Sequence, residues 1–131
     1  MGNVLVPISF GELIDKITIL EIKSQKISDA AKVKNVRHEL NELLNVWSAV
    51  EESSVDINDL RHELKMVNET LWDIEDDIRK KDQRGEFDSE FIALARSVYF
   101  HNDTRAEHKR AINLRLGSEL MEEKSYVDYK G

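Results

Sequence analysis

The sequence predicts an all-α protein, a compact bundle of four or five helices, and three observations lead to this prediction. Apolar residues recur at helical spacing through most of the chain. The 131 residues include one proline, Pro7, and five glycines, of which Gly85 and Gly117 follow long periodic segments, so that little interrupts the helices. There is no internal repeat of the kind that builds a solenoid. The length fits a single domain over residues 1–131.

The first helix is expected to run from the Ser9 cap to about Lys26. Ser9 and Glu12 have the spacing of a capping box, in which the serine oxygen accepts a hydrogen bond from the Glu12 amide and the glutamate reaches back. Apolar residues lie on two sides of this helix, with Ile19 and Ile22 opposite the main stripe. Two apolar sides indicate a central helix or one that faces a second copy of the chain, and we expect a homodimer. The main stripe is Phe10, Leu13, Ile14, Ile17, Leu20 and Ile27.

Three further helices follow. Ser28 and Asp29 can cap the second, which carries its apolar stripe to Val50, and a polar connection over residues 51–56 leads to the third, from about Asn58 to Arg84. Asp88 can cap the fourth, which ends at Leu116 before Gly117. A break at residues 101–104 is an alternative, although we favour a continuous or kinked helix. The exception to helix is a short strand at residues 4–6, paired with residues 126–129.

Composition narrows the classes of function. A net charge of −7 argues against general affinity for nucleic acid. No apolar run is long enough to cross a membrane and no signal peptide is evident, so we expect a cytoplasmic protein without membrane contact. The chain has no cysteine, which excludes disulfides, a thiolate nucleophile and sulfur-ligated metals.

Polar residues occupy positions where the helical pattern calls for apolar ones. Glu21 lies on the apolar face of the first helix. A ridge beside the seam of the third helix consists of Asn68, Trp72, Glu75 and Arg79. The stripe of the fourth helix begins with Phe91, Leu94, Ala95 and Val98, and continues at the same spacing as Asn102, Arg105, Lys109, Ile112, Asn113 and Leu116. A charge out of water without a partner is costly, so this basic strip requires buried carboxylates or a bound anion.

Three interpretations of this cluster remain open. In the first, Arg105 and Lys109 form a salt-bridge network with Glu21 and Glu75 that sets the register of the helices. In the second, they grip a phosphate or carboxylate of a small molecule, and the asparagines bond its polar groups. In the third, a bend near Asn102 turns them into solvent. The ligand-binding candidates are Glu21, Asn68, Trp72, Glu75, Arg79, Asn102, Arg105, Lys109 and Asn113.

Two other functions compete with a small binding or accessory module. One is a Mg²⁺-dependent nucleotide pyrophosphohydrolase, since acidic pairs three residues apart occur at Glu12/Asp15, Glu39/Glu42 and Asp73/Asp76. The last pair points away from the seam, however, and we assign no metal ligand. The other is a structural or partner-binding protein. No motif marks a nucleophile or a phosphate loop, so catalytic residues and cofactors remain unknown.

Longer motifs carry a family resemblance. They are residues 6–23, residues 67–69 with 71–79, residues 95–99 followed by Asn102, Asp103, Arg105, Lys109, Arg110, Ile112 and Asn113, and residues 122–126. In these segments the chain resembles small bacterial and phage proteins that are classed only as a domain of unknown function. The resemblance covers nearly the whole chain and implies no reaction. Some members look associated with cell-surface sugar and glycosyltransferase genes, which implies at most a sugar-phosphate or nucleotide-sugar connection.

Overall fold

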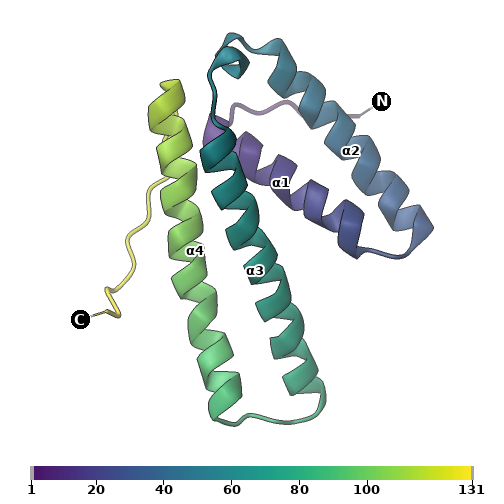
Figure 1. Cartoon of the computed structure of the whole chain (residues 1–131), viewed down its shortest axis with the longest axis vertical. Helices are drawn as coiled ribbons and strands as arrows, with labels where there is room; N and C mark the ends of the chain where they lie inside the picture. The colour runs from purple at the N-terminus through teal and green to yellow at the C-terminus, as the bar shows by residue number, and fades with distance from the viewer. Residues whose placement is uncertain (1, 131) are drawn as a thin grey trace.

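Four α-helices form the computed structural model of the protein, which describes residues 2–130. In Figure 1, α1 and α2 form one antiparallel pair, and the longer α3 and α4 form a second pair against which α1 lies. The predicted all-α bundle is therefore confirmed, with four helices. Their bounds are α1 Phe10–Lys26, α2 Ala30–Ala49, α3 Asn58–Gln83 and α4 Ser89–Leu116, and a short 3₁₀ turn, η1 Glu51–Ser54, precedes α3.

Local capping explains where these helices begin and end. The Ser9 hydroxyl accepts a hydrogen bond from the Glu12 amide at 3.1 Å, and the Asp29 and Asp88 carboxylates cap α2 and α4 in the same way. Gly117 ends α4 with a φ of 67°, the left-handed conformation that favours glycine. The helix limits predicted from these residues agree with the structure.

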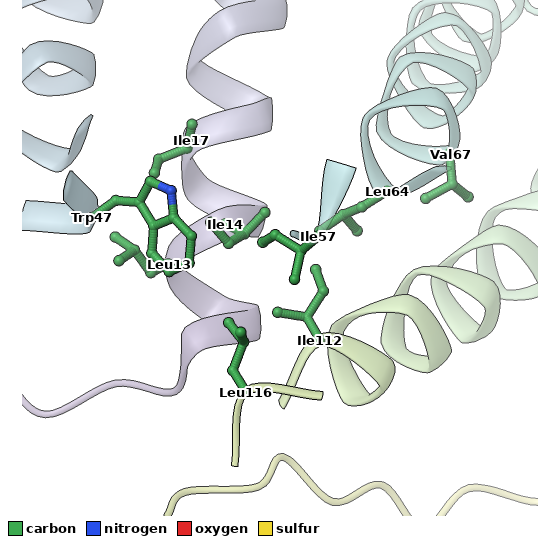
Figure 2. Packing of buried hydrophobic residues seen from close by; sticks show 9 residues of the cluster. All are labelled: Leu13, Ile14, Ile17, Trp47, Ile57, Leu64, Val67, Ile112 and Leu116. Carbon is green, nitrogen blue, oxygen red and sulfur yellow. The ribbon is translucent and has the colours of Figure 1, made fainter. Parts of the chain in front are cut away.

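The apolar core lies where α1 meets the other three helices. Figure 2 shows Trp47 of α2 against one side of α1, while Ile57, Leu64 and Ile112 approach from α3 and α4. The complete cluster is Leu13, Ile14, Ile17, Trp47, Ile57, Leu64, Val67, Ile112 and Leu116. Burial of an aliphatic side chain contributes roughly 1.5–3 kcal/mol, so this cluster is the main source of stability.

Helix α1 is central because both of its apolar sides are covered within the chain. One side packs against α2, and the other, which includes Thr18 and Ile22, packs against α3 and α4. The two-sided pattern thus reflects a central position, and its second side is not available to another copy. The two apolar sides of α1 therefore no longer support a homodimer through this helix.

The segments at both ends of the chain are irregular, and α4 is unbroken. Residues 4–6 and 126–129 are not strands, and Figure 1 shows the amino-terminal and carboxyl-terminal segments on different sides of the bundle, so the predicted pairing is wrong. An isolated two-stranded ribbon has little to stabilise it. Helix α4 is continuous through residues 101–104, where the Thr104 hydroxyl donates to the Phe100 carbonyl instead of capping a new helix. None of the helices in residues 2–130 has the length and apolarity to span a membrane.

Candidate functional site

A buried ion pair joins α1 to α4 at the centre of the polar cluster. The Asp15 carboxylate is 1% exposed, and the Arg105 guanidinium binds it through two parallel hydrogen bonds, Nε to Oδ1 at 2.9 Å and Nη2 to Oδ2 at 2.5 Å. Bidentate pairs of this kind are the strong form of the arginine–carboxylate contact. The hydrogen bond to Asp15 also raises the pKa of Arg105 above its ordinary value, which stabilises the charged guanidinium.

Helix α3 completes this network through Asn68. The Asn68 Nδ2 donates to Asp15 Oδ1 at 2.9 Å and lies 3.0 Å from Thr18 Oγ1, while the Thr18 hydroxyl donates to the Asp15 backbone carbonyl. Every buried side-chain nitrogen and oxygen in the described part of the chain has a partner. The salt-bridge network of the first interpretation therefore exists, but the acid that binds Arg105 is Asp15 and not Glu21 or Glu75. Glu21 pairs instead with Arg61 on α3, at 3.5 Å.

Lys109 lies one turn beyond Arg105 and is also neutralised. Its Nζ is 2.8 Å from Glu12 Oε2 and 2.8 Å from Glu122 Oε2, and its side chain is almost fully buried. Burial opposes the charge of Lys109, but the two carboxylates outweigh burial and raise its pKa, while Lys109 lowers the pKa of Glu122. Three carboxylates thus face Arg105 and Lys109. The bend that would turn these cations into solvent is absent.

Asn113 has a local structural role at the start of α1. Its Oδ1 accepts a hydrogen bond from the Gly11 amide at 2.6 Å, which satisfies one of the unpaired amides of the first turn. Gly11 lies so close to α4 that a Cβ atom there would collide with the Lys109 carbonyl oxygen. Asn113 and Lys109 therefore hold the α1–α4 contact together.

Beside the network, a cleft of about 380 Å³ opens between α1, α3 and α4. Its lining combines apolar and polar side chains. Arg105 has a 29% exposed side chain, and its Nη1 donates to Asn102 Oδ1 at 3.3 Å. Asn68 also lines the cleft, and its hydrogen bonds within residues 2–130 use only Nδ2, so Oδ1 remains able to accept one. The lining residues are Ile19, Ile22, Asn68, Leu71, Trp72, Glu75, Asp76, Arg79, Asn102 and Arg105.

Six of the nine predicted site residues meet at this cleft, namely Asn68, Trp72, Glu75, Arg79, Asn102 and Arg105. Glu21, Lys109 and Asn113 lie outside it. Sequence reasoning missed Asp15 and Thr18 as members of the network. A signal was present, because on a helical wheel both share the second side of α1 with Ile22.

The acidic pairs considered for Mg²⁺ do not converge. Glu12 and Asp15 bind Lys109 and Arg105, while Asp73 and Asp76 pair with surface lysines. Within residues 2–130 there is no group of three or more carboxylate or imidazole side chains placed to hold a metal ion. These acidic pairs therefore give the hydrolase alternative no support.

Comparison with known proteins gives a family and no activity. The family model described as "Family of unknown function (DUF6165)" matches residues 4–129. No curated protein and no solved structure gives a match.

Proposed function

The chain belongs to the family of unknown function DUF6165, and we propose that its cleft between α1, α3 and α4 binds a small hydroxylated, anionic molecule. A sugar phosphate, a nucleotide sugar or a hydroxylated carboxylate has this chemistry. The observation that carries the proposal is the juxtaposition, in one cleft, of a half-buried tryptophan with asparagine and arginine groups that retain free hydrogen-bonding capacity.

Trp72 supplies the apolar surface. Its ring lies at the cleft with Ile19 and Ile22, and the face of a pyranose or another flat ring can pack on such a surface. Hydroxyl groups of the ligand then meet the Asn68 Oδ1 and the Asn102 amide. The two asparagine side chains both accept and donate hydrogen bonds. A hydroxyl group does the same, whereas an ionised group only accepts, so the site suits a hydroxylated ligand better than a purely anionic one.

The charges of the site favour one main contact with an anionic group of the ligand. Asp15 already occupies the bidentate edge of the Arg105 guanidinium, Nε and Nη2. Arg105 can therefore give the ligand one hydrogen bond from Nη1, and not the stronger bidentate contact. Arg79 is 71% exposed and bonds to Glu75 through Nη1 alone. Its other guanidinium nitrogens are available, and we assign the main anion contact to Arg79.

A second function remains for the buried network, which is to hold α1, α3 and α4 in register. The observation that favours it is the complete pairing of Asp15 with Arg105 and Asn68. The two functions are compatible, because a rigid network keeps the cleft in shape. If no small molecule binds the cleft in solution, a structural or partner-binding function is the remaining interpretation.

The test is a fluorescence titration of the Trp47→Phe variant, in which Trp72 is the only tryptophan. The ligands are glucose 1-phosphate, a uridine diphosphate sugar, tartrate and inorganic phosphate. We expect saturable quenching by one hydroxylated anion, and a loss of affinity of roughly tenfold, about 1.4 kcal/mol, in Arg79→Met.

Arg84→Met is the matched control, because Arg84 is an exposed α3-end arginine outside the cleft. Equal affinity in both arginine variants, or no change in Trp72 fluorescence with any ligand, would refute the proposal. Arg105→Met is avoided here because loss of the buried pair would itself perturb the fold.

A further inference from the structure

The amino-terminal arm, residues 3–8, is an exposed apolar peptide. Leu5 is 93% exposed and Val4 86%, and Val6 and Ile8 are also exposed. Residues 2–11 contain no charged side chain, in a chain that is 34% charged. No backbone N–H of residues 3–8 donates a hydrogen bond to any residue between 2 and 130. An extended segment with free backbone groups and apolar side chains is suited to pairing with another extended segment.

A complementary surface exists at the other end of the chain. The carboxyl-terminal segment, residues 118–130, runs beside α4 and encloses a second cleft of about 580 Å³, here called the tail cleft. Its lining is Val98, Tyr99, Asn102, Asp103, Lys124, Tyr126, Val127 and Tyr129. Two of these, Tyr126 and Val127, are 82% and 89% exposed, so the chain leaves the outer lip of the cleft uncovered.

The tail cleft is a formed surface because side chains hold the carboxyl-terminal segment on α4. Glu122 binds Lys109 at 2.8 Å, and the Tyr129 and Tyr99 rings stack edge to face with centroids 4.5 Å apart. The backbone N–H groups of residues 119–129 donate no hydrogen bond to residues 2–130. One edge of the segment is therefore open to a strand.

We propose that the amino-terminal arm of one copy occupies the tail cleft of a second copy, and that the chain forms a reciprocal dimer in this way. Val4–Val6 would lie beside residues 124–127 as a short added strand. Pro7 has no N–H and ends the pairing. This inference is independent of the proposed ligand.

Two features favour a second copy over other occupants. Each chain carries one arm and one cleft, so a two-fold dimer fills both clefts and leaves no free arm. The arm is uncharged, and among the lining residues of the cleft only Asp103 and Lys124 are charged. A membrane or an unrelated protein could bury the apolar side chains of the arm but would leave the tail cleft unoccupied.

Occupation by the same chain's own arm is disfavoured by where the arm goes. Asn3 Nδ2 donates to Glu42 Oε2 at 3.1 Å, which directs the arm along α2. Figure 1 shows this end of the chain and the carboxyl-terminal segment on different sides of the bundle.

Because the chain has no cysteine, the contact can be tested by disulfide formation between single-cysteine variants. A mixture of Leu5→Cys and Val127→Cys should give a mixed disulfide dimer under mild oxidation. Leu114→Cys, at an exposed position of α4 outside the tail cleft, is the control partner and should give much less. Equal yields with both partners, or an intrachain bond in the Leu5→Cys/Val127→Cys double variant, would overturn the proposal.

Light scattering after gel filtration provides the second readout. The wild-type protein should dimerise, and Leu5→Asp or Tyr126→Asp should weaken the dimer on the order of tenfold or more. Both side chains are exposed, so these variants should keep the helical circular dichroism of the wild type. A mixture of the two variants retains one intact arm–cleft contact and should dimerise better than either alone. A wild-type monomer at all concentrations, or a dimer insensitive to both variants, would refute the arm exchange.

Discussion

Replacement of Arg105 by methionine tests whether the Asp15–Arg105 pair is a true buried ion pair. Methionine keeps much of the aliphatic volume of arginine but removes both hydrogen bonds to Asp15. The carboxylate is 1% exposed and would retain only the Asn68 amide as a side-chain donor. A buried charge without its counter-charge is the situation in which loss of one partner destabilises most.

The expected loss in the free energy of unfolding is about 3 kcal/mol. Removal of one partner of a fully buried pair costs roughly 3–5 kcal/mol, and the lower end applies because Arg105 is partly open to the cleft. For a domain of this size, that loss lowers the melting temperature by roughly 10 °C. Urea unfolding followed by circular dichroism measures it directly.

Two further variants isolate the cause. Arg115→Met removes an exposed α4 ion pair, with Asp59, and should cost less than about 1 kcal/mol. Asp15→Asn combined with Arg105→Met removes both charges and should recover part of the loss. If Arg105→Met is as stable as Arg115→Met, or if the double variant is less stable than Arg105→Met, the reasoning about buried charge is wrong.

Three other predictions concern the contacts of Lys109 and Asn113 on α4. Glu122→Gln should cost under about 1 kcal/mol at neutral pH, because Glu122 is partly exposed. Lys109 lowers the pKa of Glu122 in the folded protein below its ordinary 4.5. The difference in the free energy of unfolding between wild type and Glu122→Gln should therefore be complete above about pH 5 and should vanish as the pH falls through the folded pKa. A difference that does not depend on pH would contradict this prediction. Gly11→Ala should destabilise by about 1–3 kcal/mol in thermal unfolding, despite the better helix propensity of alanine, because its Cβ meets the Lys109 carbonyl. Asn113→Ala should cost about 1–3 kcal/mol in urea unfolding, since the Gly11 amide loses its acceptor, and a neutral result would show that water replaces it.

The helix limits could be predicted from the sequence because the signals that set them are local. Ser9, Asp29 and Asp88 each cap a helix through an amide two or three residues away, and Gly117 needs only its own φ. No contact between distant residues is required for any of these. The predicted strand failed because pairing of residues 4–6 with 126–129 depends on where the two ends of the chain lie, which no local pattern records.

The candidate site could also be predicted only in part. The helical wheel of α4 placed Asn102, Arg105 and Lys109 inward, and they do face the other helices. It could not say which acid each cation meets, because that depends on the rotation and height of α1 against α4. Gly11 permits the close approach of α1 to α4 that brings Asp15 opposite Arg105. The atom nearest to Gly11 is the Lys109 backbone carbonyl oxygen, and a backbone contact of this kind cannot be predicted from the identity of the residue.

This pairing changes what the cluster can do. Had Arg105 faced Glu75, as in one of the three interpretations of the sequence, its bidentate edge would have been available for an anion to compete with that carboxylate. Paired with Asp15, that edge is turned inward, and the exposed Arg79 becomes the cation most accessible to a ligand. Arg105 variants should therefore lose stability first and ligand affinity only as a consequence, whereas Arg79→Met should lose affinity with the melting temperature unchanged. Opposite behaviour of the two arginines would mean that the buried pair opens when the ligand binds.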